Sequence, residues 1–373
     1  MFRNKGLLIV VYVFLFSQIN AQINVKELCT LHSSINEASG IISINSGKTY
    51  WIINDSGTKP NLYEVDTLCN ILRTVEIINA NNVDWEDVCA DKNGNLYIGD
   101  FGNNSNNRKD QRIIKVLKTD LDTTQQVGAQ TIRFNYSEQV DFPPSANMLN
   151  FDMEAMVWME NQLHLFSKNR TSPFSGYTYH YVVPDSVGTY TVSRVDSFKT
   201  GPGPSILFWV TGAAISPDES QLCLLSHDKI WLFHPLNKKN LFQSPVKTIS
   251  LSHFSQKEAI AYADNGSLII ADEINLTLNN GGNLYSLSID KILNTDKLSF
   301  FQKPSVVYYI KEFIDLELGP KDVVEIFSIE GKRVQSENGS DSGRLNVGNL
   351  GRGLYYFTIR SGQLLKRNMF FKE

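Results

Sequence analysis

The sequence contains few of the residues that usually carry catalysis or bind transition metals. Its 373 residues include only four cysteines and six histidines, and the cysteine spacings fit no zinc-binding pattern. The nucleophile motif G-x-S-x-G and the zinc motif H-E-x-x-H are both absent. These absences exclude the enzyme classes that such motifs define, and they leave paired carboxylates as the main candidates for chemistry.

The chain also lacks a basic excess, and beyond its N-terminus it lacks a long apolar run. A formal net charge of −4 at pH 7 gives no general attraction to nucleic acid or anionic lipid. Residues 1–21 resemble a cleaved secretory signal, since Arg3 and Lys5 precede an apolar run that ends near the small residue Ala21. An N-terminal membrane anchor is the alternative, and no later stretch is long enough for a transmembrane helix.

A hairpin pattern recurs along the chain. The segment "EDVCADKNGNLYIGD" runs from Glu86 to Asp100, and "EAIAYADNGSLIIAD" runs from Glu258 to Asp272. Each consists of a small and apolar run, a turn rich in Asn, Asp and Gly, and a second apolar run, which predicts a β-hairpin. Three further copies begin at Glu37, Glu154 and Gly212.

Paired-strand patterns also follow these hairpins. Four strands in a unit of roughly fifty residues are typical of propeller blades. The fifth unit lacks a clear last strand, which residues 23–31 would supply, closing the ring and removing two exposed sheet edges. We therefore predict an all-β protein with a five-bladed propeller over residues 22–299, or six blades if one degenerate copy is hidden. A β-sandwich is the rival fold, but it predicts no such repeat.

The predicted hairpins bring acidic residues together. In an antiparallel hairpin the start of the first strand lies beside the end of the second, and equivalent blades place these ends at one mouth of the central channel. Hard cations such as calcium bind six to eight oxygen ligands. The alternative is that the acids accept backbone hydrogen bonds from neighbouring blades without a metal. The candidate metal ligands are Glu37, Asp55, Glu86, Asp100, Glu258 and Asp272.

Four other residues are candidates for binding a ligand at this mouth. Lys168 ends the third hairpin copy, Arg108 lies in an adjacent loop, and His227 follows the fourth copy. Trp85 lies between two acids, where it can stack on a flat ligand such as a sugar or wedge between blades. The primary hypothesis is a binding protein that uses a divalent cation to bind a small-molecule or surface ligand. A metal-dependent phosphoesterase or lactonase-like hydrolase and a structural surface protein are the alternatives.

The four cysteines are expected to be mostly free. Cys89 and Cys223 lie inside apolar strand patterns, where small buried thiols are common. Export would permit disulfides, so one disulfide is the alternative.

The C-terminal segment, residues 300–373, lacks the hairpin repeat. Its alternating strands predict a small antiparallel β-sandwich. The motifs "VEIFSIEGKRV", "LNVGNLGRGLYYFTI" and "LLKRNMFFK" resemble the C-terminal sorting domain of the type IX secretion system of Bacteroidetes. This resemblance implies interaction with that secretion machinery, a secreted or cell-surface location, and frequent removal of the domain. An accessory β-sandwich is the alternative.

The propeller segment resembles a second family. The motifs "EASGI", "WIINDSG", "DWEDVCAD" and "LYIGDFGNN" are similar to the SdiA-regulated and esterase-like phytase group of secreted propellers, over residues 35–275. The resemblance implies binding of calcium or of a phosphorylated ligand. Lys168 and Gly212 depart from the acidic pattern of the other hairpin copies, which argues against a uniform ring of metal ligands.

Overall fold

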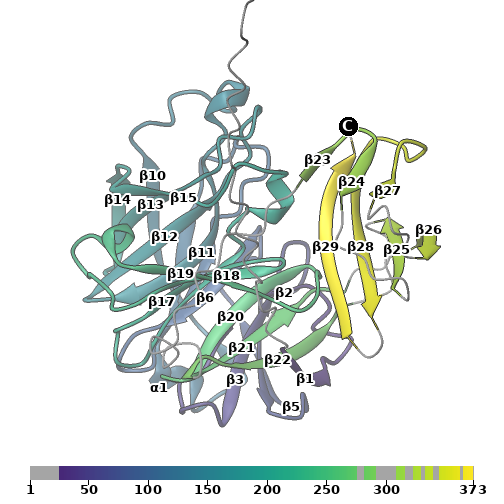
Figure 1. Ribbon diagram of the computed structural model, residues 1–373. Coiled ribbons are helices and arrows are strands. Elements are labelled where there is room, and N and C mark those ends of the chain that lie inside the picture. Colours follow the sequence, from purple (N-terminus) through teal and green to yellow (C-terminus); the bar gives the residue numbers. More distant parts are fainter. Residues whose placement is uncertain are drawn as a thin grey trace, which may run out of the picture.

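The computed structural model (Figure 1) describes residues 25–274, 281–290, 308–315, 322–328, 332–338, 344–361 and 364–372. The expected secretory signal, residues 1–21, lies outside the described residues, and so does the predicted domain boundary at residues 299 and 300. The regular secondary structure of the described residues is almost entirely strands, with short helical segments only, which confirms the prediction of an all-β protein.

Residues 26–288 form five sheets of four or five strands. The first sheet contains β2 (Ala38–Ile42), β3 (Thr49–Asn54), β4 (Asn61–Asp66), β5 (Ile71–Ile77) and β9 (Gln126–Val127). The second contains β6 (Trp85–Ala90), β7 (Leu96–Asp100), β8 (Arg112–Val116), β10 (Gln130–Tyr136) and β14 (Gly188–Val192). The third contains β11 (Asp152–Met159), β12 (Gln162–Lys168), β13 (Tyr177–Pro184) and β15 (Asp196–Lys199).

The last two sheets follow in the same order. The fourth contains β16 (Gly212–Ile215), β17 (Leu222–Ser226), β18 (Lys229–Phe233) and β19 (Val246–Ser250). The fifth contains β20 (Lys257–Asp264), β21 (Ser267–Asp272), β22 (Asn283–Ser288) and β1 (Lys26–Thr30). The short described helices are α1 (Lys118–Leu121), η1 (Ala146–Met148), η2 (Ser205–Leu207) and η3 (Leu241–Gln243).

The first strands of the five sheets form a closed ring. Strand β2 packs against β6, β6 against β11, β11 against β16, β16 against β20, and β20 against β2. These inner strands surround the central axis, as in a propeller. Strand β1 pairs with β22, so the N-terminal strand completes the fifth sheet as the sequence pattern predicts. The propeller fold is therefore confirmed.

Two strand exchanges join neighbouring sheets. Strand β9 lies between β8 and β10 in the chain, yet it pairs in parallel with β5 of the first sheet. Strand β14 lies between β13 and β15, yet it pairs in parallel with β10 of the second sheet. Both additions cover a sheet edge that would otherwise expose unpaired backbone groups. The sequence pattern did not reveal these exchanges, because it indicates strands but not their partners.

A hydrophobic cluster fills each space between successive sheets. Both faces of the sheets are covered, so the strands are apolar along most of their length. Trp85 of β6 lies in the cluster between the first and second sheets together with Trp51 of β3, and Trp85 is fully buried. Trp85 therefore wedges between blades, which is the structural alternative for this residue and not the ligand-stacking one.

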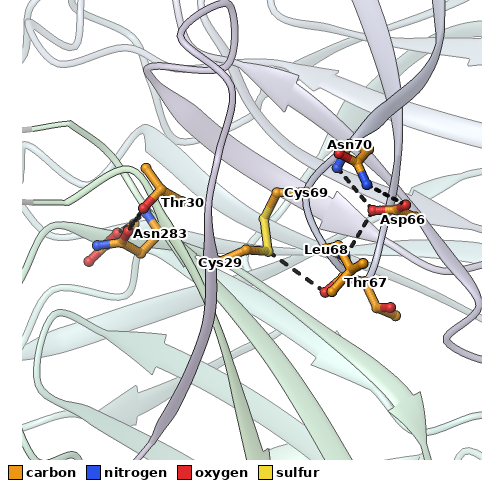
Figure 2. Close-up of a disulfide and its surroundings, with 9 residues drawn as sticks. Cys29, Thr30, Asp66, Thr67, Leu68, Cys69, Asn70 and Asn283 are labelled. Carbon is orange, nitrogen blue, oxygen red and sulfur yellow. Dashed lines mark hydrogen bonds between the residues drawn. A yellow bond between two sulfur atoms is a disulfide. The ribbon is translucent and has the colours of Figure 1, made fainter.

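A disulfide joins the ring-closing strand to the first sheet. Figure 2 shows Cys29 of β1 bonded to Cys69 in the turn after β4. The carboxylate of Asp66 shapes this turn by accepting the backbone N–H groups of Leu68 and Asn70. The expectation of mostly free cysteines is therefore wrong for one pair. Cys89 and Cys223 are free and buried, as expected.

Residues 308–372 form a separate small sandwich, drawn in yellow-green to yellow in Figure 1. One sheet orders β23 (Tyr308–Ile310), β29 (Leu364–Lys372), β28 (Gly353–Ser361), β25 (Val323–Ser328) and β26 (Arg333–Asn338). The other pairs β24 (Phe313–Asp315) with β27 (Arg344–Asn346). Their shared core includes Ile314, Val324, Leu345 and Phe357. This arrangement matches the predicted β-sandwich, except that β23 and β29 are parallel.

The disulfide should contribute measurably to stability. It closes a loop with a sequence separation of 40, and removing such a cross-link costs about 2–4 kcal/mol of unfolding free energy. We expect Cys29→Ser/Cys69→Ser to unfold at a lower denaturant concentration than the wild type. A reducing agent should lower the melting temperature of the wild type and leave that of the double variant unchanged. A wild-type melt indifferent to reductant would contradict the prediction.

Candidate functional site

Four of the five inner strands contain a β-bulge near their start. In β6 the pairing with β7 shifts between Trp85 and Asp87, which leaves Glu86 as the extra residue. A bulge changes the direction of a side chain and is frequent beside functional sites. The equivalent extra residues of β2, β11 and β20 are Ser39, Glu154 and Glu258.

Hydroxyl groups occupy the equivalent position in the first and fourth sheets. The Ser39 hydroxyl donates to the backbone oxygen of Trp85 at 2.8 Å. The Thr211 hydroxyl donates in the same way to the backbone oxygen of Lys257 at 2.7 Å. Each acceptor directly precedes a bulged glutamate of the neighbouring sheet. These hydroxyls therefore hold the backbone that aims the glutamates.

Asp87, next to the bulge, connects three inner strands. Its carboxylate accepts the backbone N–H of Val88 at 2.8 Å and that of Met156 at 2.7 Å, and it also accepts the N–H of Ala213. One side chain thus joins β6 to β11 and β16. Complete burial raises the pKa of Asp87 well above its usual range, and the three hydrogen bonds offset part of that effect. This carboxylate locks blades together without a metal, the alternative considered for the acids, at a position the sequence analysis did not name.

Glu86 points the opposite way, into a group of other carboxylates. Oxygen atoms of Asp55, Asp84 and Glu86 lie within 4.8 Å of one another, and those of Glu86, Asp152 and Glu154 do the same. Glu86 is only 6% exposed. Within the described part of the chain, no basic side chain forms an ion pair with its carboxylate, although Lys168 and Arg170 attract it electrostatically from beyond ion-pair distance. Glu86 is therefore a buried acid without a direct counter-ion, shared by two carboxylate groups.

Crowding changes the ionisation of these acids. Burial raises the pKa of Glu86 well above its usual range, and the neighbouring Glu154 and Asp55 raise it further. Burial also raises the pKa of Asp55 to about 6 and, with nearby carboxylates, the pKa of Glu273 to about 10. The pKa of Asp84 is raised for the same reason. A bound cation would remove this bias toward the protonated forms.

Two basic residues neutralise one side of the group. Lys168 Nζ lies 2.9 Å from Glu154 Oε2 and 3.8 Å from Glu258 Oε2. Arg170 Nε lies 2.6 Å from Asp152 Oδ2, and its terminal nitrogen lies 3.3 Å from Glu154 Oε1. The third sheet thus provides its own counter-ions. We call the whole set the mouth cluster; its members are Asp55, Asp84, Glu86, Asp152, Glu154, Lys168, Arg170, Glu258 and Glu273.

On the other side of the mouth cluster the described residues form no such ion pairs, although Lys168 and Arg108 lower the pKa of Asp55 and Asp84, respectively, from a longer distance. Ser56 donates its backbone N–H to Asp55 and its hydroxyl to Asp84. Close packing leaves no space for a side chain at Gly102, where a Cβ would lie 2.0 Å from Glu86 Oε1 and 2.6 Å from Asp84 Oδ2. The carboxylates of Asp55, Asp84 and Glu86 are thereby held together with no basic side chain in ion-pair distance among the described residues.

The structure brings some of the predicted metal ligands together and separates others. Asp55, Glu86 and Glu258 lie in the mouth cluster. Asp100 is instead ion-paired with Arg108 at 3.0 Å and with Arg112 at 2.8 Å. Asp100 and Arg108 thus engage each other beside the mouth.

Two other predicted ligands also lie outside the mouth cluster. Asp272 accepts the Tyr285 hydroxyl at 2.9 Å and the backbone N–H of Asn283 at 2.8 Å. It faces the third strand of its sheet, because successive side chains alternate, and the next residue, Glu273, faces the mouth. Glu37 joins the site only through its backbone oxygen, which accepts the N–H of Asp55.

Two of the predicted ligand-binding residues lie close to the mouth cluster. His227 Nε2 is 3.3 Å from Glu258 Oε1, and Lys168 is described above. Sequence reasoning missed Trp209, whose partly exposed ring has Arg170 Cζ 4.7 Å from its centre. It also missed Asp84 and Asp152 as members of the mouth cluster. The pattern D-x-E, which recurs at "DWE" and "DME", was the available signal for both.

The opposite ends of the inner hairpins are linked by ion pairs. Lys92, in the turn after β6, lies 2.8 Å from Glu219 in the turn after β16. Lys238 contacts the same glutamate and lies 3.7 Å from Glu160 in the turn after β11. Turns of three sheets are therefore connected there, and the acidic side chains gather at the other end.

Comparison with known protein families identifies the C-terminal segment. Residues 310–371 match the family model of the secretion system C-terminal sorting domain, which confirms the predicted sorting tail. This domain implies interaction with the type IX secretion system and places the protein outside the cell or on its surface. No helix of the described residues is long and apolar enough to cross a membrane. No curated protein matches the chain.

Solved structures with a similar course of the chain include propellers. An aldose sugar dehydrogenase from Streptomyces coelicolor, in its PQQ-bound form, is 10% identical with a TM-score of 0.40, covering 71% of this chain and 97% of that one. The propeller domain of Cps50 (Swd1) from Myceliophteria thermophila is 7% identical with a TM-score of 0.37, covering 71% and 99%. PorZ, a surface component of the type IX secretion system of Porphyromonas gingivalis, is 12% identical with a TM-score of 0.33, covering 89% and 44%. Scores this low carry no argument about function.

Replacing the neighbouring acids Asp87 and Glu86 by their neutral amides should have different effects on the unfolding free energy. Asp87→Asn replaces an acceptor of three backbone N–H groups by an amide that accepts less strongly and adds unpartnered donors. We expect it to lower the unfolding free energy by about 1–3 kcal/mol. Glu86→Gln removes a carboxylate whose ionisation is disfavoured, so it should leave stability unchanged or raise it. Denaturant unfolding at neutral pH with a chelator measures both. An equal loss in both variants would contradict the assignment.

Proposed function

We propose that this secreted or cell-surface propeller binds a divalent cation at its acidic mouth, and that the cation recruits a ligand there. The observation that carries the proposal is Glu86, which is nine-tenths buried, has no ion-pair partner among the described residues and belongs to two groups of close carboxylates. Ionised carboxylates at this spacing repel one another, so either one of them is protonated or a positive charge lies between them.

The cation position that fits best lies among Asp55, Asp84 and Glu86. The second group, which contains Asp152 and Glu154, is already paired with basic side chains. Carboxylate oxygens favour calcium, magnesium or manganese over softer metals. Calcium binds six to eight oxygens, so three carboxylates would leave coordination positions for water or for ligand oxygens.

The rim suggests how a ligand would be recruited. Trp209 is partly exposed, and its indole nitrogen donates to the backbone oxygen of Asn169 at 2.6 Å, which fixes the ring. A ligand with oxygen atoms for the cation and a flat apolar face for Trp209 would use both features. The resemblance of the propeller segment to the SdiA-regulated and esterase-like phytase group agrees with a cation-dependent site.

Calcium should stabilise the protein, and more so at neutral than at acidic pH. Binding at a hundred times the dissociation constant adds about 2.7 kcal/mol to the unfolding free energy, which corresponds to a rise of a few degrees in melting temperature. Because burial raises the pKa of Asp55 to about 6, this carboxyl is protonated in acid and must release its proton to bind calcium. We expect the calcium-induced shift to be large at about pH 7.5 and small at about pH 5.

Without calcium, the stability of the protein should change with pH in the opposite direction. A carboxyl with a raised folded-state pKa stabilises the fold below its unfolded pKa and loses that contribution as pH rises to the folded value. The chelator-treated protein should therefore become less stable between about pH 4 and about pH 6 through Asp55. Asp55→Asn should abolish most of the calcium shift, whereas the control Asp272→Asn should retain it. A melt that ignores calcium and chelator at both pH values would reject the cation.

A metal-dependent hydrolase is the second candidate. The absence of a basic partner for Glu86 among the described residues favours it, because such a carboxylate beside a cation can accept a proton from cation-bound water. Calcium-dependent release of p-nitrophenol from p-nitrophenyl phosphate, or opening of a lactone, would be expected from the wild type. Glu86→Gln should then lower the rate by about 10²–10⁴-fold. No turnover despite a calcium-dependent melt would reject the hydrolase and leave the binding protein.

A further inference from the structure

The mouth cluster places one lysine where the equivalent strands have acids. Asp55 follows β3 and pairs with Glu37 through the backbone, and Glu273 follows β21 and pairs with Gln256 in the same way. In the third sheet the residue at this position is Lys168, which faces Asp152. In these three sheets the second-strand end of the hairpin therefore has one charged side chain at the mouth, and only in the third sheet is that side chain basic.

The Lys168 ammonium group lies between carboxylates of two different sheets. Its Nζ atom is 2.9 Å from Glu154 of the third sheet and 3.8 Å from Glu258 of the fifth sheet. The side chain is buried, and the Trp209 ring centre lies 5.5 Å from Nζ. The fourth sheet, between these two, has Thr211 at the position equivalent to the bulged glutamates, and its His227 contacts Glu258 at 3.3 Å. Lys168 thus bridges two carboxylates across the gap that this sheet leaves.

We infer that Lys168 is an internal counter-ion that limits the mouth to a single divalent cation, by occupying a second cation position between Glu154 and Glu258. The inference rests on the proposed function, because it assigns the one cation to the opposite side of the mouth, among Asp55, Asp84 and Glu86. Glu86 supports this assignment, because it is nine-tenths buried and has no basic partner among the described residues.

The lysine also gives the site its asymmetry. With Glu154 and Glu258 held by the ammonium group and Asp152 held by Arg170, the third-sheet side of the mouth is neutralised within the protein. The attraction for a cation is then strongest on the first- and second-sheet side. Trp209 lies on the neutralised side, beside Lys168 and Arg170. A ligand that bridges the cation and the tryptophan would have to cross the mouth, so Lys168 would determine the length of ligand that fits.

The number of calcium ions bound per chain tests this inference. Full-length protein is stripped with chelator, titrated with calcium by calorimetry, and analysed for bound metal after desalting. We expect one ion in the wild type, two in Lys168→Gln, and one in Lys168→Arg, which keeps the positive charge. Lys168→Glu, which introduces the acid found at the equivalent positions, should also bind two.

The outcomes separate the two proposals. One ion in every variant, or two in the wild type, would overturn the role of Lys168 and leave the proposed cation binding intact. No ion in the wild type with one in Lys168→Gln would reject the proposed function but support Lys168 as the occupant of a cation position. Folding of Lys168→Gln only in the presence of calcium would also support it. If neither neutral nor acidic variant folds even with calcium, the ammonium group is not replaceable by a cation and the inference is wrong.

Discussion

The bulge in strand β6 is the constraint on which the site depends. One extra residue in the pairing with β7 separates the directions of two consecutive acids. Asp87 accepts backbone N–H groups from three inner strands, while Glu86 turns into the mouth, where other carboxylates are its nearest charged neighbours. The same chemical group is therefore structural at one position and lacks an ion pair at the next, because one carboxylate has fixed backbone donors and the other has none among the described residues.

Repetition of the bulge explains why the charges gather. Equivalent bulges in β11 and β20 direct Glu154 and Glu258 to the same mouth, and the hydroxyls of Ser39 and Thr211 hold the adjacent backbone. A fully acidic arrangement of this kind would oppose folding by charge repulsion. Lys168 and Arg170 offset the repulsion on one side only, so the remaining attraction for a cation is directional.

The disulfide and the C-terminal sorting domain both agree with a location outside the cell or on its surface. Disulfides persist in oxidising compartments, and the Cys29–Cys69 bond joins the strand that closes the propeller to the first sheet. The sorting domain at residues 310–371 gives the same location by independent means. Together these features describe a secreted or cell-surface propeller that is cross-linked by a disulfide and has one acidic mouth.

The sequence by itself determined the fold class, the ring closure by the N-terminal strand, the sorting tail, and the gathering of acids such as Glu86 and Glu258 at one mouth. Alternating apolar runs and turn residues are local signals, so they can be read without the structure. Only the tertiary structure decided which acid faces which way. Glu273 and not Asp272 faces the mouth, because side-chain direction reverses with each residue along a strand. A bulge shifts this alternation by one residue, and the sequence carries no reliable signal for a bulge. Some partners of the carboxylates, such as Lys168 for Glu258, come from residues distant in the chain, which only the packing of sheets brings together.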